Sequence, residues 1–299
     1  GKETTGPMFE GTFTALVTPF TATGELDRDT LRKLVDRQID AGITGLVPVG
    51  TTGESPTLTD DEHHEVIRVV VEQSAGRVPV IAGCGSNNTV EALEHTRFAK
   101  EVGAEASLHV AGYYNKPSAT GFLRHFQLLA DSVDLPLIVY NIPGRVGKNI
   151  DNETMLALAE HPNIVGVKEA SGDIDQMMDL ILRRPPGFTV LSGDDAITLP
   201  LMALGGNGII SVTSNLLPAK MVDLVQRMLD GDTAGARAVH YEILPVINAL
   251  MGLDTNPIPV KGAMHAAGLL EESYRLPMTP LTEPAKQKLH GVLKEHGII

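Results

Sequence analysis

The sequence predicts an α/β protein folded as a (β/α)8 TIM barrel with a C-terminal helical extension, and two observations lead to this fold class. Short apolar runs alternate eight times with longer segments of mixed polar and apolar residues, as in parallel strands joined by crossover helices. Runs such as Leu137-Ile138-Val139 are apolar on both faces, which is typical of strands that helices cover on one side and barrel packing fills on the other. An open doubly wound sheet is the alternative, and eight such units fit a closed barrel better.

The apolar runs and the capping residues place the individual elements. Helices are expected to begin at Thr59, Asn88 and Asp151, because each has a capping side chain and is followed by acidic residues. A helical tail is expected from about Asp232 onward. We expect strands near residues 12–17, 44–49, 78–82, 105–110, 135–140, 164–168, 188–192 and 208–212.

One domain is expected for the whole chain, since barrels often exceed the usual domain size. The barrel is expected over residues 8–231, and the C-terminal helical extension of the same domain over residues 232–299. Residues 1–7 are expected to be an expression remnant or a short extension. No linker or low-complexity tract indicates a second domain.

Composition and charge argue against several classes of protein. The 299 residues are 42% hydrophobic, yet no apolar run reaches the roughly 18 residues that a membrane helix needs. The formal net charge of -13 would repel nucleic acid and anionic membranes. The single cysteine, Cys84, excludes an internal disulfide, and residues 1–10 contain no apolar stretch typical of a signal peptide. We therefore expect a cytoplasmic protein that binds neither nucleic acid nor membrane.

A lysine at the end of the sixth expected strand is the main candidate for catalysis, because barrel enzymes place their active sites at the C-terminal ends of the strands. Strand alternation puts Ile164, Gly166 and Lys168 on one face, and Val165 and Val167 against the helices. Desolvation would lower the pKa of the Lys168 amine and make it a nucleophile that condenses with a carbonyl. The alternative is a lysine that extends from the strand end into solvent.

Polar residues at the ends of other strands support the catalytic interpretation. Tyr140, one strand away, is placed to shuttle protons. The glycine-rich turn at residues 50–55 can hold a carboxylate on its backbone N–H groups, and Arg145 can bind one through a bidentate pair. At least one of the neighbours Tyr113 and Tyr114 is expected to reach a site or an interface. Each of these features alone is also compatible with a simpler interpretation. The turn is then an ordinary loop, Arg145 faces solvent, and Tyr113 and Tyr114 are core aromatic residues.

The absence of certain residues argues against phosphosugar substrates and against a metal-dependent aldolase. Phosphate sites of barrel enzymes usually follow strands seven and eight, yet residues 185–219 contain no Lys or Arg. The ten histidines include no His-x-His or His-Glu-x-x-His spacing, so neither a metal nor another cofactor is expected. Asp194 and Asp195 are interpreted as a helix N-cap.

Along nearly its whole length, the chain resembles the dihydrodipicolinate synthase / N-acetylneuraminate lyase family. The motifs that carry the resemblance are GTTGES at 50–55, YYNKP at 113–117, YNIPGR at 140–145, VKEA at 167–170, SGDD at 192–195 and NPIPVK at 256–261. The resemblance implies that Lys168 holds pyruvate as an imine, while Thr51, Tyr140 and Tyr114 form a proton relay. It also implies a homotetramer built from tight dimers, in which Tyr114 comes from a neighbouring subunit. The family positions that bind substrate correspond to Thr52, Arg145, Gly193 and Ile210.

The arginine at position 145 favours one branch of the family. It is similar to the arginine with which dihydrodipicolinate synthases bind the carboxylate of aspartate-β-semialdehyde, whereas the sugar-acid lyases generally lack it. The resemblance therefore implies condensation of pyruvate with L-aspartate-β-semialdehyde to 4-hydroxy-tetrahydrodipicolinate, in diaminopimelate and lysine biosynthesis. The alternatives are a pyruvate-dependent sugar-acid or 4-hydroxy-2-oxoglutarate aldolase, and a catalytically silent barrel that only binds a keto acid.

Inhibition by lysine is a further implication of the resemblance. Pro56 and Asp60 depart from the pattern of the regulated members, so partial inhibition is expected. The residues that match the lysine-binding positions of those members are His63, Asn87, Glu91 and Tyr113.

Overall fold

Eight parallel strands form one sheet in the computed structural model, which describes residues 6–299. The strand order is β2-β1-β8-β7-β6-β5-β4-β3, and a parallel bridge between Leu46 and Val80 adds pairing beyond β2. Strands that are consecutive in sequence are therefore neighbours, which confirms the (β/α)8 barrel and the eight expected strands to within a few residues. The strands are β1 (Gly11–Ala15), β2 (Gly45–Val47), β3 (Ile81–Gly83), β4 (Ala106–Val110), β5 (Leu137–Asn141), β6 (Ile164–Glu169), β7 (Thr189–Ser192) and β8 (Gly208–Ser211).

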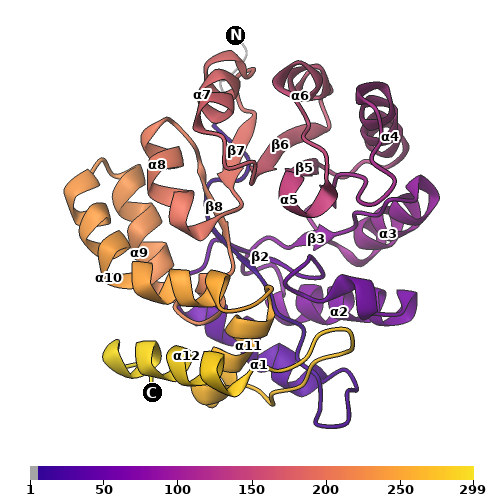
Figure 1. Ribbon diagram of the computed structural model, residues 1–299. Coiled ribbons are helices and arrows are strands. Elements are labelled where there is room, and N and C mark those ends of the chain that lie inside the picture. The colour runs from indigo at the N-terminus through magenta and orange to yellow at the C-terminus, as the bar shows by residue number, and fades with distance from the viewer. Residues whose placement is uncertain (1–5) are drawn as a thin grey trace. The chain divides into compact units, whose positions relative to one another are not determined.

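Helices alternate with these strands along the chain (Figure 1). The expected helix starts are confirmed, because the side chains of Thr59, Asn88 and Asp151 each accept a hydrogen bond from a backbone N–H of the first turn. None of the helices within residues 6–299 is long and apolar enough to cross a membrane. The helices are α1 (Arg28–Asp40), α2 (Asp60–Ser74), α3 (Thr89–Val102), α4 (Ala119–Ser132), α5 (Pro143–Val146), α6 (Asn152–Ala159), α7 (Ile174–Arg183), α8 (Thr198–Ala203), α9 (Pro218–Leu229), α10 (Thr233–Gly252), α11 (Ile258–Ala266) and α12 (Glu283–Glu295), with 3-10 turns η1 (Ser55–Thr57), η2 (Asp195–Ile197) and η3 (Thr213–Asn215).

The chain divides into two compact units. The first unit contains the chain up to Gly11 together with Ile81–Ile210, and the second contains Thr12–Val80 and Ser211–Ile299. The boundary at residue 231 between a barrel and its extension stays a prediction. Residues 1–5 of the expected N-terminal remnant lie outside the described residues.

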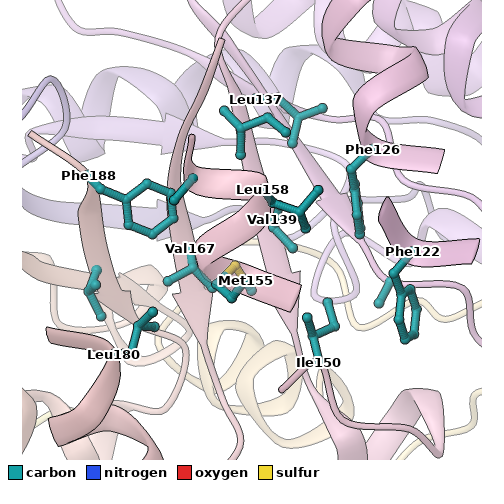
Figure 2. Packing of buried hydrophobic residues seen from close by; sticks show 14 of the residues in the cluster. Phe122, Phe126, Leu137, Val139, Ile150, Met155, Leu158, Val167, Leu180 and Phe188 are labelled. Atoms are coloured by element: carbon teal, nitrogen blue, oxygen red, sulfur yellow. The ribbon is translucent and has the colours of Figure 1, made fainter. Parts of the chain in front are cut away.

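In the first unit, a hydrophobic cluster lies between the strands and the helices that cover them (Figure 2). Val139 of β5 and Val167 of β6 are fully buried in this cluster, so the expected orientation of Val167 is confirmed. Ile164 is in the same cluster, and the prediction that it shares a face with Lys168 is wrong. The reason is a register irregularity at Leu137/Ile138, where β5 pairs with β6 and the strict alternation of side chains is interrupted.

In the second unit, the helices of the C-terminal tail pack around their own apolar core. Asp232 accepts a hydrogen bond from the Gly235 N–H and caps α10, so a helix begins where the sequence predicts one. Fully buried side chains of α10, α11 and α12, among them Leu250, Met264 and Leu293, form the cluster. The tail is therefore a folded part of this unit, and α11 packs against both α10 and α12.

Candidate active site

The side chain of Lys168 lies in the interior at the end of β6, where it is 7% exposed. Burial lowers the pKa of Lys168 to about 7, with a smaller lowering from Arg145 and an opposing effect of Asp195. A large fraction of the amine is therefore neutral near pH 7, and a neutral amine is the form that attacks a carbonyl. The solvent-exposed alternative for this lysine does not describe its position.

Tyr140 lies directly beside Lys168, because the two residues are register partners on β5 and β6. The Lys168 Nζ atom lies 4.0 Å from the centroid of the Tyr140 ring. Burial raises the pKa of Tyr140 to about 12, so the phenol keeps its proton at neutral pH. A protonated phenol next to an uncharged amine can donate a proton and take it back as bonds form at the amine nitrogen.

Gly193, which follows β7, leaves space for the Lys168 side chain. A Cβ atom at this position would lie 3.1 Å from Lys168 Cγ and 3.2 Å from Lys168 Cε, closer than most Cβ contacts. Ile210 is buried on β8, which pairs with β7 through the register partners Ser192 and Ile209. The matched positions Gly193 and Ile210 thus lie on adjoining segments of the first unit.

Arg145 projects from the short helix α5 and brings positive charge to this group of residues. Its side chain is exposed, yet its charge lowers the pKa of both Lys168 and Tyr140. Both effects are electrostatic, so the guanidinium lies within coulombic range of the Lys168 amine and the Tyr140 phenol. A carboxylate bound by Arg145 would therefore lie in the same region.

The acidic residues after β7 have two different environments. Asp194 accepts a hydrogen bond from the Ala196 N–H and caps η2, as the sequence predicts. Asp195 is buried, and its charge raises the pKa of Lys168. Sequence reasoning missed this second effect, although an acidic residue just beyond a buried strand was a signal for it. Within residues 6–299, no group of three or more His, Cys, Asp or Glu side chains is arranged to hold a metal ion.

Tyr114 lies on a strained loop of the first unit and is 90% exposed. Its φ of 69° places a bulky residue in the left-handed region, where the surrounding structure must hold it. Two hydrogen bonds hold the loop: Asn87 Nδ2 donates to the Tyr113 carbonyl at 3.1 Å, and Asn115 Nδ2 donates to the Asn87 carbonyl at 2.8 Å. The loop therefore presents the phenol of Tyr114 outward from the chain.

The second unit carries the glycine-rich turn at residues 50–55. The turn is closed by hydrogen bonds from the Gly53 N–H to the Gly50 carbonyl and from the Glu54 N–H to the Thr51 carbonyl. A Cβ atom at Gly53 would lie 3.1 Å from the Val49 Cα atom, so only glycine fits there without displacement. Thr51 is partly buried, and Thr52 is buried.

The positions matched to a lysine site are divided between the two units. Asn87 and Tyr113 are joined by the hydrogen bond described above, and Glu91 follows in the first turn of α3. His63 is buried in α2 of the second unit. The structure thus brings Asn87 together with Tyr113 and places Glu91 one helical turn further along.

Comparison with known proteins identifies the family of the chain. The family model described as the Dihydrodipicolinate synthetase family matches residues 8–296. A 4-hydroxy-tetrahydrodipicolinate synthase of Maridesulfovibrio salexigens is 51% identical over 97% of this chain and 99% of its own length. The chain belongs to the Dihydrodipicolinate synthetase family.

Two solved structures show the same fold over nearly the full length. A dihydrodipicolinate synthase from Cyanidioschyzon merolae, solved with lysine bound, has a TM-score of 0.95 and 40% identity, covering 98% of this chain and 100% of that one. A dihydrodipicolinate synthase described as the first monomeric variant also has a TM-score of 0.95 and 40% identity, covering 98% of each chain. One of these relatives thus binds lysine, and the other is a monomer.

We predict that pyruvate and borohydride attach a reduced adduct to Lys168, since a buried amine with a lowered pKa is a good nucleophile. Mass spectrometry of the peptide that contains Lys168 measures the adduct. Lys168→Ala should abolish it, whereas Lys148→Ala, which changes an exposed lysine of the same unit, should not. With a pKa of about 7, the ammonium form dominates at lower pH, so the initial trapping rate should fall by roughly 10-fold per pH unit well below 7. Trapping at another lysine, or a rate independent of pH, would contradict the assignment.

Proposed function

We propose that the protein is a lyase of the Schiff-base type that condenses pyruvate with L-aspartate-β-semialdehyde to 4-hydroxy-tetrahydrodipicolinate, in diaminopimelate and lysine biosynthesis. The observation that carries this proposal is the buried amine of Lys168, with its pKa lowered to about 7 and a protonated Tyr140 beside it. The 51% identity to a protein named for this reaction supports the choice of substrates. The lone buried Cys84 fits a reducing compartment, and we place the reaction in the cytoplasm.

The first half of the reaction joins pyruvate to the protein. The neutral amine of Lys168 attacks the ketone carbon of pyruvate, the resulting alcohol leaves as water, and a C=N bond remains. Each step moves a proton, which Tyr140, Thr51 and Tyr114 would relay. Thr52 and the amides of the turn at residues 50–55 would hold the pyruvate carboxylate, as loop N–H groups do for anions.

The second half makes the new carbon–carbon bond. Loss of a proton from the pyruvate methyl group gives an enamine, whose carbon attacks the aldehyde of aspartate-β-semialdehyde. The amino group of the second substrate then attacks the imine carbon and displaces Lys168, which closes the ring and regenerates the free amine. Arg145 would hold the carboxylate of the second substrate throughout, beside the reacting atoms and away from the pyruvate carboxylate.

The choice between this reaction and the alternatives depends on Arg145. Replacing the residue should lower kcat/KM for aspartate-β-semialdehyde by about 10- to 150-fold, the range expected for a charge-assisted pair of about 1.5–3 kcal/mol. Arg145→Lys should restore little, because an ammonium keeps the charge without the bidentate geometry. Steady-state kinetics of Arg145→Ala and Arg145→Lys measure this, and Arg124→Ala, an exposed arginine of α4, is the matched control.

The Arg145 variants also distinguish the proposed reaction from the alternative functions. Borohydride trapping of pyruvate should continue in Arg145→Ala, because Lys168 is unchanged. Unaltered specificity would mean that Arg145 only faces solvent, and a sugar-acid or 4-hydroxy-2-oxoglutarate aldolase would then be the better proposal. Absence of turnover by the native protein with every aldehyde, despite trapping, would favour the catalytically silent keto-acid-binding barrel.

The assembly that we propose is a homotetramer of two tight dimers, in which Tyr114 completes the site of a neighbouring subunit. Two exposed apolar patches of the first unit support two kinds of interface. The first contains Tyr114 and Val90, whose chain segments are joined by the hydrogen bond from Asn87 to the Tyr113 carbonyl. The second is the stripe of Ile174, Met178 and Leu182, spaced four residues apart on one face of α7.

Leu182→Glu tests the second patch, because a charge on this 82% exposed leucine would be buried in the contact between dimers. Sedimentation equilibrium should give a mass of four chains for the native protein and of two chains for the variant. Leu276→Glu, in which a similarly exposed leucine of the second unit is replaced, should remain tetrameric. A native monomer would refute the proposed assembly.

Feedback by lysine is the regulation that we propose for this assembly. The resemblance of His63, Asn87, Glu91 and Tyr113 to a lysine site supports it, as does the lysine-bound relative. Calorimetry should detect binding of L-lysine at millimolar concentration, and inhibition should be partial because Pro56 and Asp60 differ from the regulated members. Glu91→Gln should weaken binding by removing the carboxylate that would pair with the ligand ammonium. Absence of any heat of binding at about 10 mM L-lysine would reject the site, because about 10 mM is the weakest dissociation constant that we expect.

A further inference from the structure

Within the second unit, a buried lysine of the C-terminal tail binds the glycine-rich turn at residues 50–55. The Lys261 Nζ atom donates to Glu54 Oε2 at 2.5 Å, to the Thr18 carbonyl at 2.9 Å and to the Ser273 carbonyl at 3.0 Å. An ammonium has three N–H donors, and each has an acceptor here. The position of Lys261 is therefore defined in three directions.

The surroundings of this ion pair exclude water. The side chains of Lys261 and Glu54 are 0% and 2% exposed. The rings of Phe20 and Tyr274 lie 4.4 Å and 5.5 Å from the Lys261 Nζ atom. Burial lowers the pKa of Lys261, and the charge of Glu54 opposes this effect. Water cannot replace either partner of the ion pair unless this part of the unit opens.

The turn that the pair holds has an unfavourable backbone. Glu54 has φ 56° and ψ 37°, and Val49 at the other end of the turn has φ 61°. Both are non-glycine residues in the left-handed region, which persists only where the surroundings impose it. Thr18 contributes to this constraint, because its hydroxyl donates to the Gly53 carbonyl at 2.7 Å. The hydrogen bond from Lys261 to Glu54 holds the same turn, through a residue of the C-terminal tail.

A second bond from the same segment reaches Thr52. The Asn256 Nδ2 atom donates to Thr52 Oγ1 at 2.9 Å, in a buried environment. Because the hydroxyl accepts this bond, its own hydrogen is left to donate in another direction. The tail thus holds the turn at Thr52 and at Glu54, on both sides of Gly53.

Energetics distinguish a positioning role from a stabilising one. A fully buried ion pair loses hydration on both partners, and an apolar pair of similar volume is often equally stable. What an apolar pair cannot reproduce is the set of directions that Lys261 imposes on three oxygen atoms. Groups that hold a substrate need this accuracy, since a displacement of about 1 Å can slow a reaction by roughly 10²-fold.

We propose that Lys261, together with Asn256, is a positioning residue that aligns Thr51 and Thr52 for the pyruvate carboxylate. The inference rests on the proposed function, in which these threonines act on pyruvate. It assigns to α11 a part in catalysis without contact to the substrate. The expected signature is a change in the kinetics of pyruvate that exceeds any change in stability.

The test uses the full-length protein and three variants. Lys261→Met with Glu54→Gln removes both charges and leaves no buried ion unpaired, and Lys261→Arg keeps a cation with a different donor geometry. Asn256→Ala removes only the bond to Thr52, and it keeps the inference testable if the first two variants do not fold. Lys220→Met with Glu242→Gln is the matched control, because this pair of α9 and α10 has a 2.8 Å contact at the surface.

The measurements are the thermal unfolding midpoint, the kcat and KM for each substrate, and borohydride trapping at Lys168. The variants of Lys261 and Asn256 should unfold within several degrees of the native midpoint. Their KM for pyruvate should rise and kcat should fall, so that kcat/KM for pyruvate is lower by about 10- to 100-fold. The KM for aspartate-β-semialdehyde should change less, since its carboxylate is assigned to Arg145. Trapping should still reach completion, at higher pyruvate concentration.

Two results would overturn the inference in different ways. A lower unfolding midpoint with unchanged kcat and KM per folded molecule would show that the pair only stabilises the unit, and the proposed function would stand. Failure of the native protein to trap pyruvate or to consume aspartate-β-semialdehyde would refute the proposed function, and the positioning role with it. Measuring the native protein first separates the two cases.

Discussion

The chemistry that we propose for this protein depends on removing one amine from water. Lys168 has the ordinary side chain of a surface residue, and the nucleophilic character that we assign to it comes from the desolvation that lowers its pKa to about 7. The neighbouring residues suit that environment. Tyr140 supplies an aromatic face and a phenol whose own burial keeps it protonated, and Gly193 leaves the volume that the side chain needs. Asp195 and Arg145 adjust the pKa in opposite directions, so the amine stays between full charge and full neutrality.

Local sequence patterns were sufficient for most of the fold. The eight strands were predictable because apolar runs and polar interruptions recur along the chain, and the starts at Thr59, Asn88 and Asp151 were predictable because capping needs only neighbouring residues. The orientation of Ile164 was not, since it depends on how β5 pairs with β6 at Leu137/Ile138. A register irregularity depends on how two strands pair, so the sequence of either strand alone does not indicate it.

The candidate site was predictable to a smaller extent. Lys168 and Tyr140 could be placed side by side from strand order, because both lie at strand ends. The buried pair of Glu54 and Lys261 left no local signal, since its members are 207 residues apart and each resembles a surface charge in sequence. The influence of Asp195 on Lys168 was missed although its place just beyond a buried strand was a signal, because the two residues come from different strand ends. Long-range electrostatic contacts require coordinates, whereas caps and strand periodicity do not.

The distance in sequence between the turn at residues 50–55 and its anchors affects how the protein is made. Asn256 and Lys261, which bond to the turn across 204 and 207 residues, leave the ribosome long after it. Until they arrive, the left-handed conformations of Val49 and Glu54 lack part of the support that holds them. The turn therefore lacks two of its hydrogen-bond partners until the chain has been synthesised as far as Lys261.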